Sequence, residues 1–359
     1  VTDEAYKAGA SDVTVFYQDN QLFMSRLRYA DDVTTIDQWV PAGIEKAFSE
    51  GASRLVILGD SPEIPEDLSD RRKAFAQANM ATMTGLYSLI KKTASNWSLL
   101  AYATPKWAKL VFPDMNEDEA VSTLWSKIFS SVRLDAPDVV EAWLEHNASL
   151  AKSASYMNEQ NFDALHFSSP HTELTVGLAD GHIWKGGAKT TLTGISCNSN
   201  LPTEEIFTTP HNQKVNGFVT STKPMMYQGK LIEGIRVRFK DGVAVEAFAE
   251  KNEDVLHELI KTDENACRLG EVALVPHSSP ISKSGILFKN TLFDENASCH
   301  LAFGGSYDHC MQEGDDIVER GANKSIVHQD WMIGSADMDV FGIKDGKRTL
   351  IMHKGEWFY

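Results

Sequence analysis

Residues 164–178, Ala-Leu-His-Phe-Ser-Ser-Pro-His-Thr-Glu-Leu-Thr-Val-Gly-Leu, decide how the chain divides. Apolar residues gather in two short runs, Ala164–Phe167 and Glu173–Leu178, on either side of a polar segment that contains a proline. Runs of this length and composition are typical of strands. From about Asp163 onward such strand-like segments dominate, whereas helical patterns are frequent before that point.

The chain after residue 160 is predicted to form a strand-rich α+β or barrel-like domain, residues 161–359. Turn signals such as Asp180-Gly181 and Asp241-Gly242 separate its strands. Further strands are predicted at Gly217–Thr220, Ile235–Lys240, Val243–Ala247, Glu271–Val275, Ile286–Phe288 and Val340–Ile343, and helices at about Lys251–Thr262 and near Ile317–Arg320.

The chain before this boundary is predicted to form an α/β domain, residues 1–160, with a parallel sheet covered by helices, because short strands alternate with helical patterns. The predicted strands are Val13–Tyr17, Arg54–Leu58 and Ser98–Thr104, and the predicted helices are about Ile36–Ser49, Leu68–Thr93, Glu117–Val132 and Pro137–Asn158. The first residues read as the later part of a helix, so we expect a preceding βα unit upstream of Val1. The loops after these strands contain neither G-x-G-x-x-G nor a Walker sequence, which argues against nucleotide binding.

Composition restricts the possible partners. The formal net charge is −16. Residues 1–160 carry 15 Lys and Arg against 23 Asp and Glu, which is −8, so the remaining −8 belongs to residues 161–359 and the charge is spread over both parts of the chain. An anionic surface repels phosphate backbones and anionic lipid, so we expect neither nucleic-acid nor membrane partners. The four cysteines are scattered without C-x-x-C spacing, which favours a reducing compartment, and we expect the cytoplasm.

Short metal and nucleophile signatures are missing from the sequence. His257-Glu258-Leu259-Ile260-Lys261 begins like the zincin H-E-x-x-H motif but has Lys where the second His must stand. We interpret it as a solvated helix surface. There is no H-x-H and no G-x-S-x-G, which argues against mononuclear metal hydrolases and serine hydrolases.

Four segments of the second domain place acids and histidines in strand or turn context. In Pro-Thr-Glu-Glu-Ile-Phe-Thr (202–208), one Glu of the pair can point inward while the other faces solvent. In Leu-Gly-Glu-Val-Ala-Leu-Val-Pro (269–276), Glu271 opens an apolar strand, where an ionised carboxylate is costly unless it is paired or binds metal. The other two segments are residues 292–307, which contain Glu295, His300 and Tyr307 around a Gly-Gly turn, and residues 327–334, which contain His328 and Asp330.

Taken together these segments predict a metal site. His328 and Asp330 are two residues apart, so on an extended backbone they project from the same face. Imidazole and carboxylate without thiolate is the ligand set of a hydrolytic zinc, cobalt or manganese centre. The number of candidate side chains suits two divalent ions that share a bridging carboxylate. Each residue alone has a plainer explanation, as a surface acid, an edge-strand Glu or an ordinary polar His.

The sequence resembles the aminopeptidase T / aminopeptidase S metallopeptidases in P-T-E-E-I-F-T, L-G-E-V-A-L-V-P, L-F-D-E-N-A-S-C-H-L-A-F-G and V-H-Q-D-W-M-I-G, which occur in the family's order. The resemblance covers essentially the whole chain and is strongest from about Asp163. It implies five metal ligands, with Glu271 as the bridging carboxylate: Glu205, Glu271, His300, His328 and Asp330. Glu204 is left out as the solvated member of its pair.

The resemblance also implies a function and a mechanism. We expect an aminopeptidase that removes N-terminal residues from small peptides through a water activated by two metal ions. Glu295 would shuttle the proton as general base unless it is itself a ligand, and Tyr307 would donate to the oxyanion. The family's fold joins an α/β domain to a C-terminal domain carrying the site, and its members form dimers, so we expect a homodimer. Two alternatives stay open: a two-metal hydrolase of another bond, such as a phosphoester, and a non-catalytic metal-binding oligomer.

Overall fold

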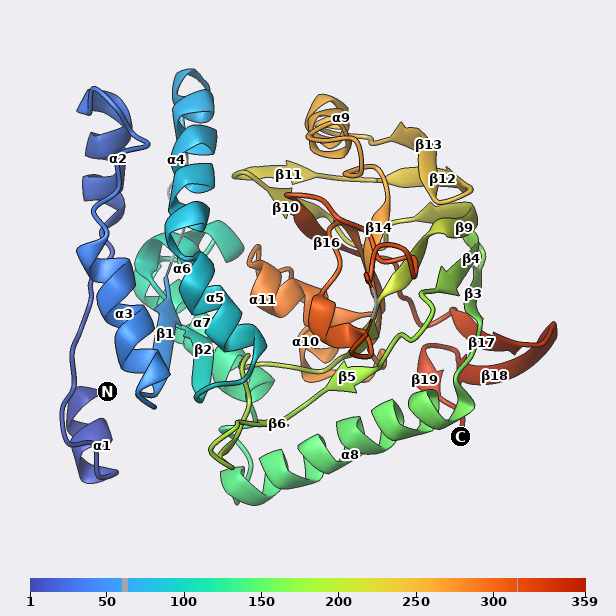
Figure 1. The fold of residues 1–359 in the computed structure, drawn as a ribbon, viewed down its shortest axis with the longest axis horizontal. Helices are drawn as coiled ribbons and strands as arrows, with labels where there is room; N and C mark the ends of the chain where they lie inside the picture. The colour runs from blue at the N-terminus through green and yellow to red at the C-terminus, as the bar shows by residue number, and fades with distance from the viewer. Residues whose placement is uncertain (60–63, 315) are drawn as a thin grey trace.

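The computed structural model describes residues 1–59, 64–314 and 316–359, and it places a helix-rich part beside a strand-rich part (Figure 1). The helix-rich part contains α1 (Thr2–Lys7), α2 (Asn20–Tyr29), α3 (Trp39–Ser49), β1 (Arg54–Leu58), η1 (Glu66–Leu68), α4 (Ser69–Thr82), α5 (Thr84–Lys91), β2 (Trp97–Ala101), α6 (Pro105–Val111), α7 (Glu117–Ser131) and α8 (Val139–Gln160). Strands β1 and β2 pair in parallel. The predicted parallel pairing is therefore present, but this sheet has two strands.

Helices α7 and α8 begin where side chains cap their first turns. Asn116 accepts a hydrogen bond from the backbone N–H of Glu119, and Asp138 accepts one from that of Glu141. Such caps satisfy N–H groups that have no partner inside the helix, and the acids of the first turn of α7 complement its dipole. Helix α8 ends at Asn161, whose φ of 46° is the left-handed conformation that closes many helices.

The strand-rich part consists mainly of two antiparallel sheets. Its elements are β3 (Ala164–Ser169), β4 (Thr172–Leu178), β5 (Lys185–Gly186), β6 (Lys189–Thr190), β7 (Ser196–Cys197), β8 (Ile206–Thr208), β9 (Pro210–Thr220), β10 (Met225–Tyr227), β11 (Lys230–Ile232), β12 (Arg236–Lys240), β13 (Val243–Phe248), α9 (Glu253–Ile260), β14 (Leu269–Leu274), α10 (Pro280–Lys283), α11 (Thr291–Asp294), η2 (Glu295–Ala297), β15 (His300–Gly304), η3 (Asp308–Cys310), β16 (His328–Met332), β17 (Asp339–Lys344), β18 (Lys347–His353) and β19 (Glu356–Trp357). The larger sheet has the order β13-β12-β9-β4-β3-β17-β18-β19, and the smaller one has the order β16-β15-β14-β8-β5. The mixed helices and sheets agree with the predicted class.

The cores of the two parts cross the predicted domain boundary. Helix α8 lies along the strand-rich part (Figure 1), and its Leu150, Ala154 and Met157 belong to the same buried cluster as strands from both sheets. Conversely, residues 281–297 pack against α6 and α7, where Phe288, Phe293 and Trp107 are buried together. The division at residue 160 into two domains stays a prediction.

Four local predictions are wrong. Val13–Tyr17 is not a strand, because no strand pairs with it among the described residues, and Val15, Phe16 and Tyr17 are exposed. The predicted helix Leu68–Thr93 is two helices separated at Met83. Beside the break, the hydroxyls of Thr82 and Thr84 donate to backbone carbonyls one turn back, which competes with regular helix geometry.

The other two lie in the strand-rich part. Ile286–Phe288 is irregular, because the N–H of Phe288 donates to the carboxylate of Asp294 and its carbonyl accepts from the indole of Trp107. Backbone groups satisfied in this way need no neighbouring strand. The stretch Ile317–Arg320 forms a turn closed by backbone hydrogen bonds and not a helix.

Candidate metal centre

The smaller sheet carries four of the five predicted ligands, and the fifth precedes one of its strands. Glu271 lies on β14, His300 begins β15, and His328 and Asp330 lie on β16. Glu205 comes immediately before β8, which pairs with β14. Since β14, β15 and β16 are neighbours, four segments far apart in the sequence meet on one sheet.

Strand register places these side chains on one face and leaves room between them. Ala302 of β15 is opposite Glu271 on one side and opposite Asp330 on the other. Residues directly opposite on antiparallel strands project from the same face. The small side chain of Ala302, which is fully buried, therefore separates two carboxylates without filling the space above it.

The ligand atoms form two overlapping groups. His300 Nε2 lies 3.0 Å from Glu205 Oε2 and 3.7 Å from Glu271 Oε1. His328 Nε2 lies 3.1 Å from Glu271 Oε2 and 3.6 Å from Asp330 Oδ1. Within each group, Glu205–Glu271–His300 and Glu271–His328–Asp330, one ligand atom per residue lies within 4.8 Å of the others. Glu271 belongs to both groups, as a bridging carboxylate would.

Backbone carbonyls orient both imidazoles. His300 Nδ1 lies 3.2 Å from the carbonyl oxygen of Ser298, and His328 Nδ1 lies 2.7 Å from that of Gly305. A carbonyl can only accept, so we assign the proton to Nδ1 in each ring. With the proton on Nδ1, Nε2 is the nitrogen of each ring that faces the carboxylates and would bind a metal ion, and a carbonyl on the other nitrogen is a usual partner of a metal-binding histidine.

Buried polar atoms at this site are incompletely satisfied by the protein. Glu205 Oε2 and His328 Nε2 have no hydrogen-bond partner despite their short distances to neighbours, because the geometry of a hydrogen bond is not met. Glu205, Glu271 and His300 are each less than a tenth exposed. Buried charges and polar atoms are costly unless they are paired or coordinate metal. Divalent cations would satisfy these atoms, so the residues fit the metal ions that the sequence predicts.

The pKa shifts at the site reflect its excess of negative charge. Burial raises the pKa of Glu205, and it also opposes ionisation of Glu271, but the nearby imidazoles of His300 and His328 lower the pKa of Glu271 to about 2. Burial alone would lower the pKa of each histidine, but the facing carboxylates raise both well above the usual range. Counting Glu295, four carboxylates face two imidazoles, and this surplus suits two dications.

The two predicted catalytic residues lie at the edge of this cluster. Glu295, half-buried in η2, has a pKa raised well above the usual range by burial and by the carboxylates of Asp330 and Glu205. The ring of Tyr307 lies 4.5 Å from the ring of His328. Burial, together with the charges of Glu271 and Asp330, raises the pKa of Tyr307 well above the usual range, so its hydroxyl keeps its proton.

Glu204 contradicts the sequence prediction, because it is buried and not solvated. Its two carboxylate oxygens accept hydrogen bonds from Arg133 at 2.6 and 2.8 Å. The prediction was wrong because Arg133, which follows α7, and His146 of α8 cover the side of this segment that faces away from the metal cluster. Sequence reasoning missed Arg133, His146 and Asn296, the partners of this segment, and local spacing gave no signal for contacts across 57 to 92 residues.

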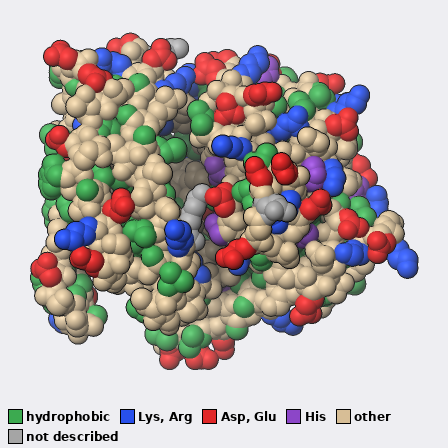
Figure 2. Space-filling view, viewed as in Figure 1, with side chains coloured by type: hydrophobic (Ala, Val, Ile, Leu, Met, Phe, Trp, Pro, Cys, Tyr) green, Lys and Arg blue, Asp and Glu red, His purple; other side chains and the backbone are tan. Residues whose placement is uncertain are grey.

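The molecular surface is hollowed between the two parts. Figure 2 shows this hollow on one face, with histidine side chains visible at its strand-rich wall. A separate open cleft of about 1270 Å³ lies over α7 and α10, lined by residues such as Trp125, Phe129 and Lys283. None of the predicted ligands lines that cleft, so its size does not make it the candidate site.

Among the described residues, no helix is both long and apolar enough to span a bilayer.

Comparison with known proteins gives concordant matches. The family described as thermophilic metalloprotease (M29) matches residues 1–357. Aminopeptidase T of Thermus aquaticus is 46% identical over 364 residues, which cover 99% of this chain and 89% of that protein. Aminopeptidase 2 of Geobacillus stearothermophilus is 40% identical over 368 residues, covering 100% and 89%. The solved structure described as wild-type AmpT from Thermus thermophilus superposes with a TM-score of 0.93 at 44% identity, covering 99% of this chain and 89% of that one.

Proposed function

This chain belongs to the thermophilic metalloprotease (M29) family, and on that premise we infer that it is a metal-dependent aminopeptidase whose active site is the candidate metal centre. Family membership and the names of its relatives support a peptide-bond hydrolase with a divalent metal cofactor. The observation that carries the assignment to this site is the pair of overlapping ligand groups that share Glu271.

We propose that the centre holds two divalent ions, zinc, cobalt or manganese, through Glu205, Glu271, His300, His328 and Asp330. Oxygen and nitrogen donors without thiolate suit these metals. Glu271 would bridge the ions, Glu205 and His300 would complete one site, and His328 and Asp330 would complete the other. Two ions match the surplus of carboxylates over imidazoles.

We further propose how the chain's own residues act on a peptide. When bound, the metal ions would polarise the substrate carbonyl and lower the pKa of a water. Glu295, whose pKa is raised by burial and by neighbouring carboxylates, would take up a proton and pass it to the departing amine. Tyr307, which keeps its proton, would donate a hydrogen bond to the developing oxyanion.

Small peptides are the proposed substrates, and a carboxylate of the cluster would receive the free α-amino group. From the resemblance we also propose a homodimer that acts in the cytoplasm, with the catalytic centre in a domain of residues 161–359. Phosphoester hydrolysis is less well supported. Arg268, the cation nearest the ligand Glu271 in sequence, donates to the backbone carbonyls of Asn212 and Asp241 instead of facing substrate.

A substrate panel tests this function. Aminoacyl anilides and a phosphoryl chromogenic ester would be offered to protein dialysed against chelator, with and without added Zn²⁺, Co²⁺ or Mn²⁺. We expect metal-dependent release of the anilide and none from the ester. Metal-dependent cleavage of the ester alone would favour the phosphoester hydrolase, and metal binding without any turnover would favour the non-catalytic protein.

A further inference from the structure

Glu204 lies deep between the two parts, beside the proposed ligand Glu205. It is 3% exposed, and Arg133, two residues after the end of α7, donates from Nη1 to one carboxylate oxygen at 2.6 Å and from Nη2 to the other at 2.8 Å. This bidentate pairing fixes both distance and plane. Removal of either partner would leave the other as an uncompensated buried charge, which is strongly destabilising.

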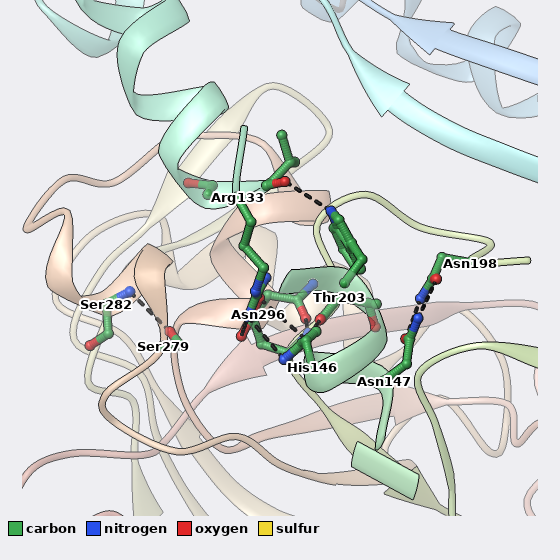
Figure 3. Close-up of polar contacts among 12 residues, drawn as sticks. Arg133, His146, Asn147, Asn198, Thr203, Ser279, Ser282 and Asn296 are labelled. Carbon is green, nitrogen blue, oxygen red and sulfur yellow. Dashed lines mark hydrogen bonds and ion pairs between the residues drawn. The ribbon is translucent and has the colours of Figure 1, made fainter. Parts of the chain in front are cut away.

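His146 of α8 extends the network to the backbone. Arg133 Nη2 lies 2.9 Å from His146 Nδ1, and His146 Nε2 lies 2.7 Å from the carbonyl oxygen of Thr203. Because a guanidinium only donates, Nδ1 accepts and the proton lies on Nε2, which donates to Thr203. Figure 3 shows Arg133, His146, Thr203 and Asn296 converging at this point.

Asn296 fixes the same segment from the opposite side. Its side-chain oxygen accepts the backbone N–H of Glu204 at 2.6 Å, and its amide nitrogen lies 3.0 Å from the carbonyl of Leu292 and 3.5 Å from Glu295 Oε1. The chain just before Glu205 is thus held at three points: the Thr203 carbonyl, the Glu204 N–H and the Glu204 carboxylate.

The carboxylate of Glu204 accepts from Arg133, whereas that of the next residue, Glu205, lies 3.0 Å from His300 Nε2, so the two side chains point in different directions. Because the backbone between them is short and held by Asn296 and His146, fixing Glu204 restricts the direction of Glu205. We propose that Glu204, held by Arg133 and His146, is a positioning residue that sets the direction of Glu205 and thereby the affinity of the metal site to which Glu205 belongs. This inference rests on the proposed metal centre. It adds that Arg133, which follows α7, and His146 of α8 influence the affinity for one of the two ions.

Four variants test the proposal: Glu204→Gln, Arg133→Met, the double variant, and Asn147→Ala as control. Zn²⁺ binding to the apoprotein would be titrated in competition with a chromogenic chelator, and the Tm of each apoprotein would be measured. We expect Glu204→Gln and Arg133→Met each to lower the affinity for the ion bound by Glu205 by about 10–100-fold. This is the typical effect of removing a residue that supports a metal ligand. The affinity for the other ion should change less than threefold, because its ligands His328 and Asp330 both lie on β16, three strands away from β8.

The double variant and the control separate positioning from general packing. The double variant should lose no more affinity than the worse single variant, since both act through one contact. Asn147 exchanges two amide hydrogen bonds with Asn198, at 2.9 and 2.8 Å, so it ties the same helix to the same connection without touching Glu204. Replacement of Asn147 should leave the affinity for each ion within threefold of the wild-type value.

Two results would overturn the proposal. One is unchanged affinity for both ions in Glu204→Gln and Arg133→Met, whatever happens to the Tm of the apoprotein. The other is an equal loss at both ions together with a lower Tm, which would mark a structural salt bridge. Failure of the proposed metal centre looks different, because the wild-type apoprotein would then bind no Zn²⁺ at all, and failure of the proposed peptidase activity would leave Zn²⁺ binding intact without anilide turnover.

Discussion

At the scale of single residues, Glu271 carries the most weight because both ligand groups contain it. Glu271→Gln keeps the side-chain volume but removes the negative charge between two proposed dications. We expect turnover of an aminoacyl anilide to fall by at least about 10³, which is roughly 4 kcal/mol of barrier, and both ions to bind more weakly. Steady-state kinetics, with bound metal counted by mass spectrometry, checks this.

The control for Glu271 must be an exposed glutamate in a strand. Glu246 of β13 pairs at 3.4 Å with Arg238 at the surface, where ion pairs contribute little. Glu246→Gln should change turnover less than twofold. Near-normal turnover of Glu271→Gln with two ions bound would rule out the bridging role.

Tyr307 should affect turnover and leave metal binding alone. Tyr307→Phe removes the hydroxyl but keeps the ring that packs 4.5 Å from the ring of His328. Loss of one oxyanion donor costs about 10²–10³ in kcat, so we expect a fall of that order with the metal content unchanged. A variant that loses metal instead would mean that Tyr307 supports His328 and does not contact the substrate.

The sequence allowed the cluster to be predicted, because each proposed ligand stands in a short segment whose strand character is local. It did not reveal what covers Glu204. Whether an acid beside a strand faces water or a buried arginine depends on packing between distant segments, and Arg133 lies 71 residues away. The prediction that Glu204 and Glu205 point in different directions agrees with the structure. The prediction that Glu204 faces solvent was wrong, because Arg133 lies there.

At the scale of elements, the small side chain of Ala302, the central residue of β15, leaves room between the carboxylates of the neighbouring strands. Ala302→Val would add two methyl groups between Glu271 and Asp330, which are its direct neighbours on β14 and β16. Overpacking of this kind costs about 1–3 kcal/mol. We expect both ions to bind at least about tenfold more weakly, because the two carboxylates can no longer approach a shared position.

The same change elsewhere provides the control for Ala302. Ala103, which is equally buried in the cluster around α6 and α7, lies outside the candidate site. Ala103→Val should lower the Tm by a similar amount and leave the Zn²⁺ affinity unaltered. If the two variants lose the same metal affinity, the small size of Ala302 has no special role.

Predictions of strands failed where a segment had the apolar composition of a strand but no neighbouring strand to pair with. Val13–Tyr17 has the β-branched and aromatic residues of a strand, but among the described residues it has no partner. Ile286–Phe288 looks equally strand-like, yet Asp294 and Trp107 bind its backbone. In contrast, Arg54–Leu58 and Glu117–Ser131 were predicted within a residue or two, because local periodicity and caps determine them.

At the scale of the whole molecule, the metal should be needed for activity and not for folding. Val272, Leu301 and Trp331 alternate with the ligands along their strands, so they project from the other face of the smaller sheet into the cluster shared by both sheets and α8, which needs no metal to form. We expect chelation to abolish activity, added divalent metal to restore it, and the far-ultraviolet circular dichroism to stay largely the same. Wholesale loss of the dichroism signal on chelation would mark a structural ion.

The position of α8 has a consequence for synthesis on the ribosome. Its Leu150, Ala154 and Met157 are buried against strands that follow it in the chain, as far as Met352. At roughly 5–20 residues per second, these side chains emerge about 10–40 s before the last of those strands. During that interval α8 presents an apolar stripe with no native partner, and a nascent chain arrested just after α8 has left the exit tunnel should be a substrate for chaperones.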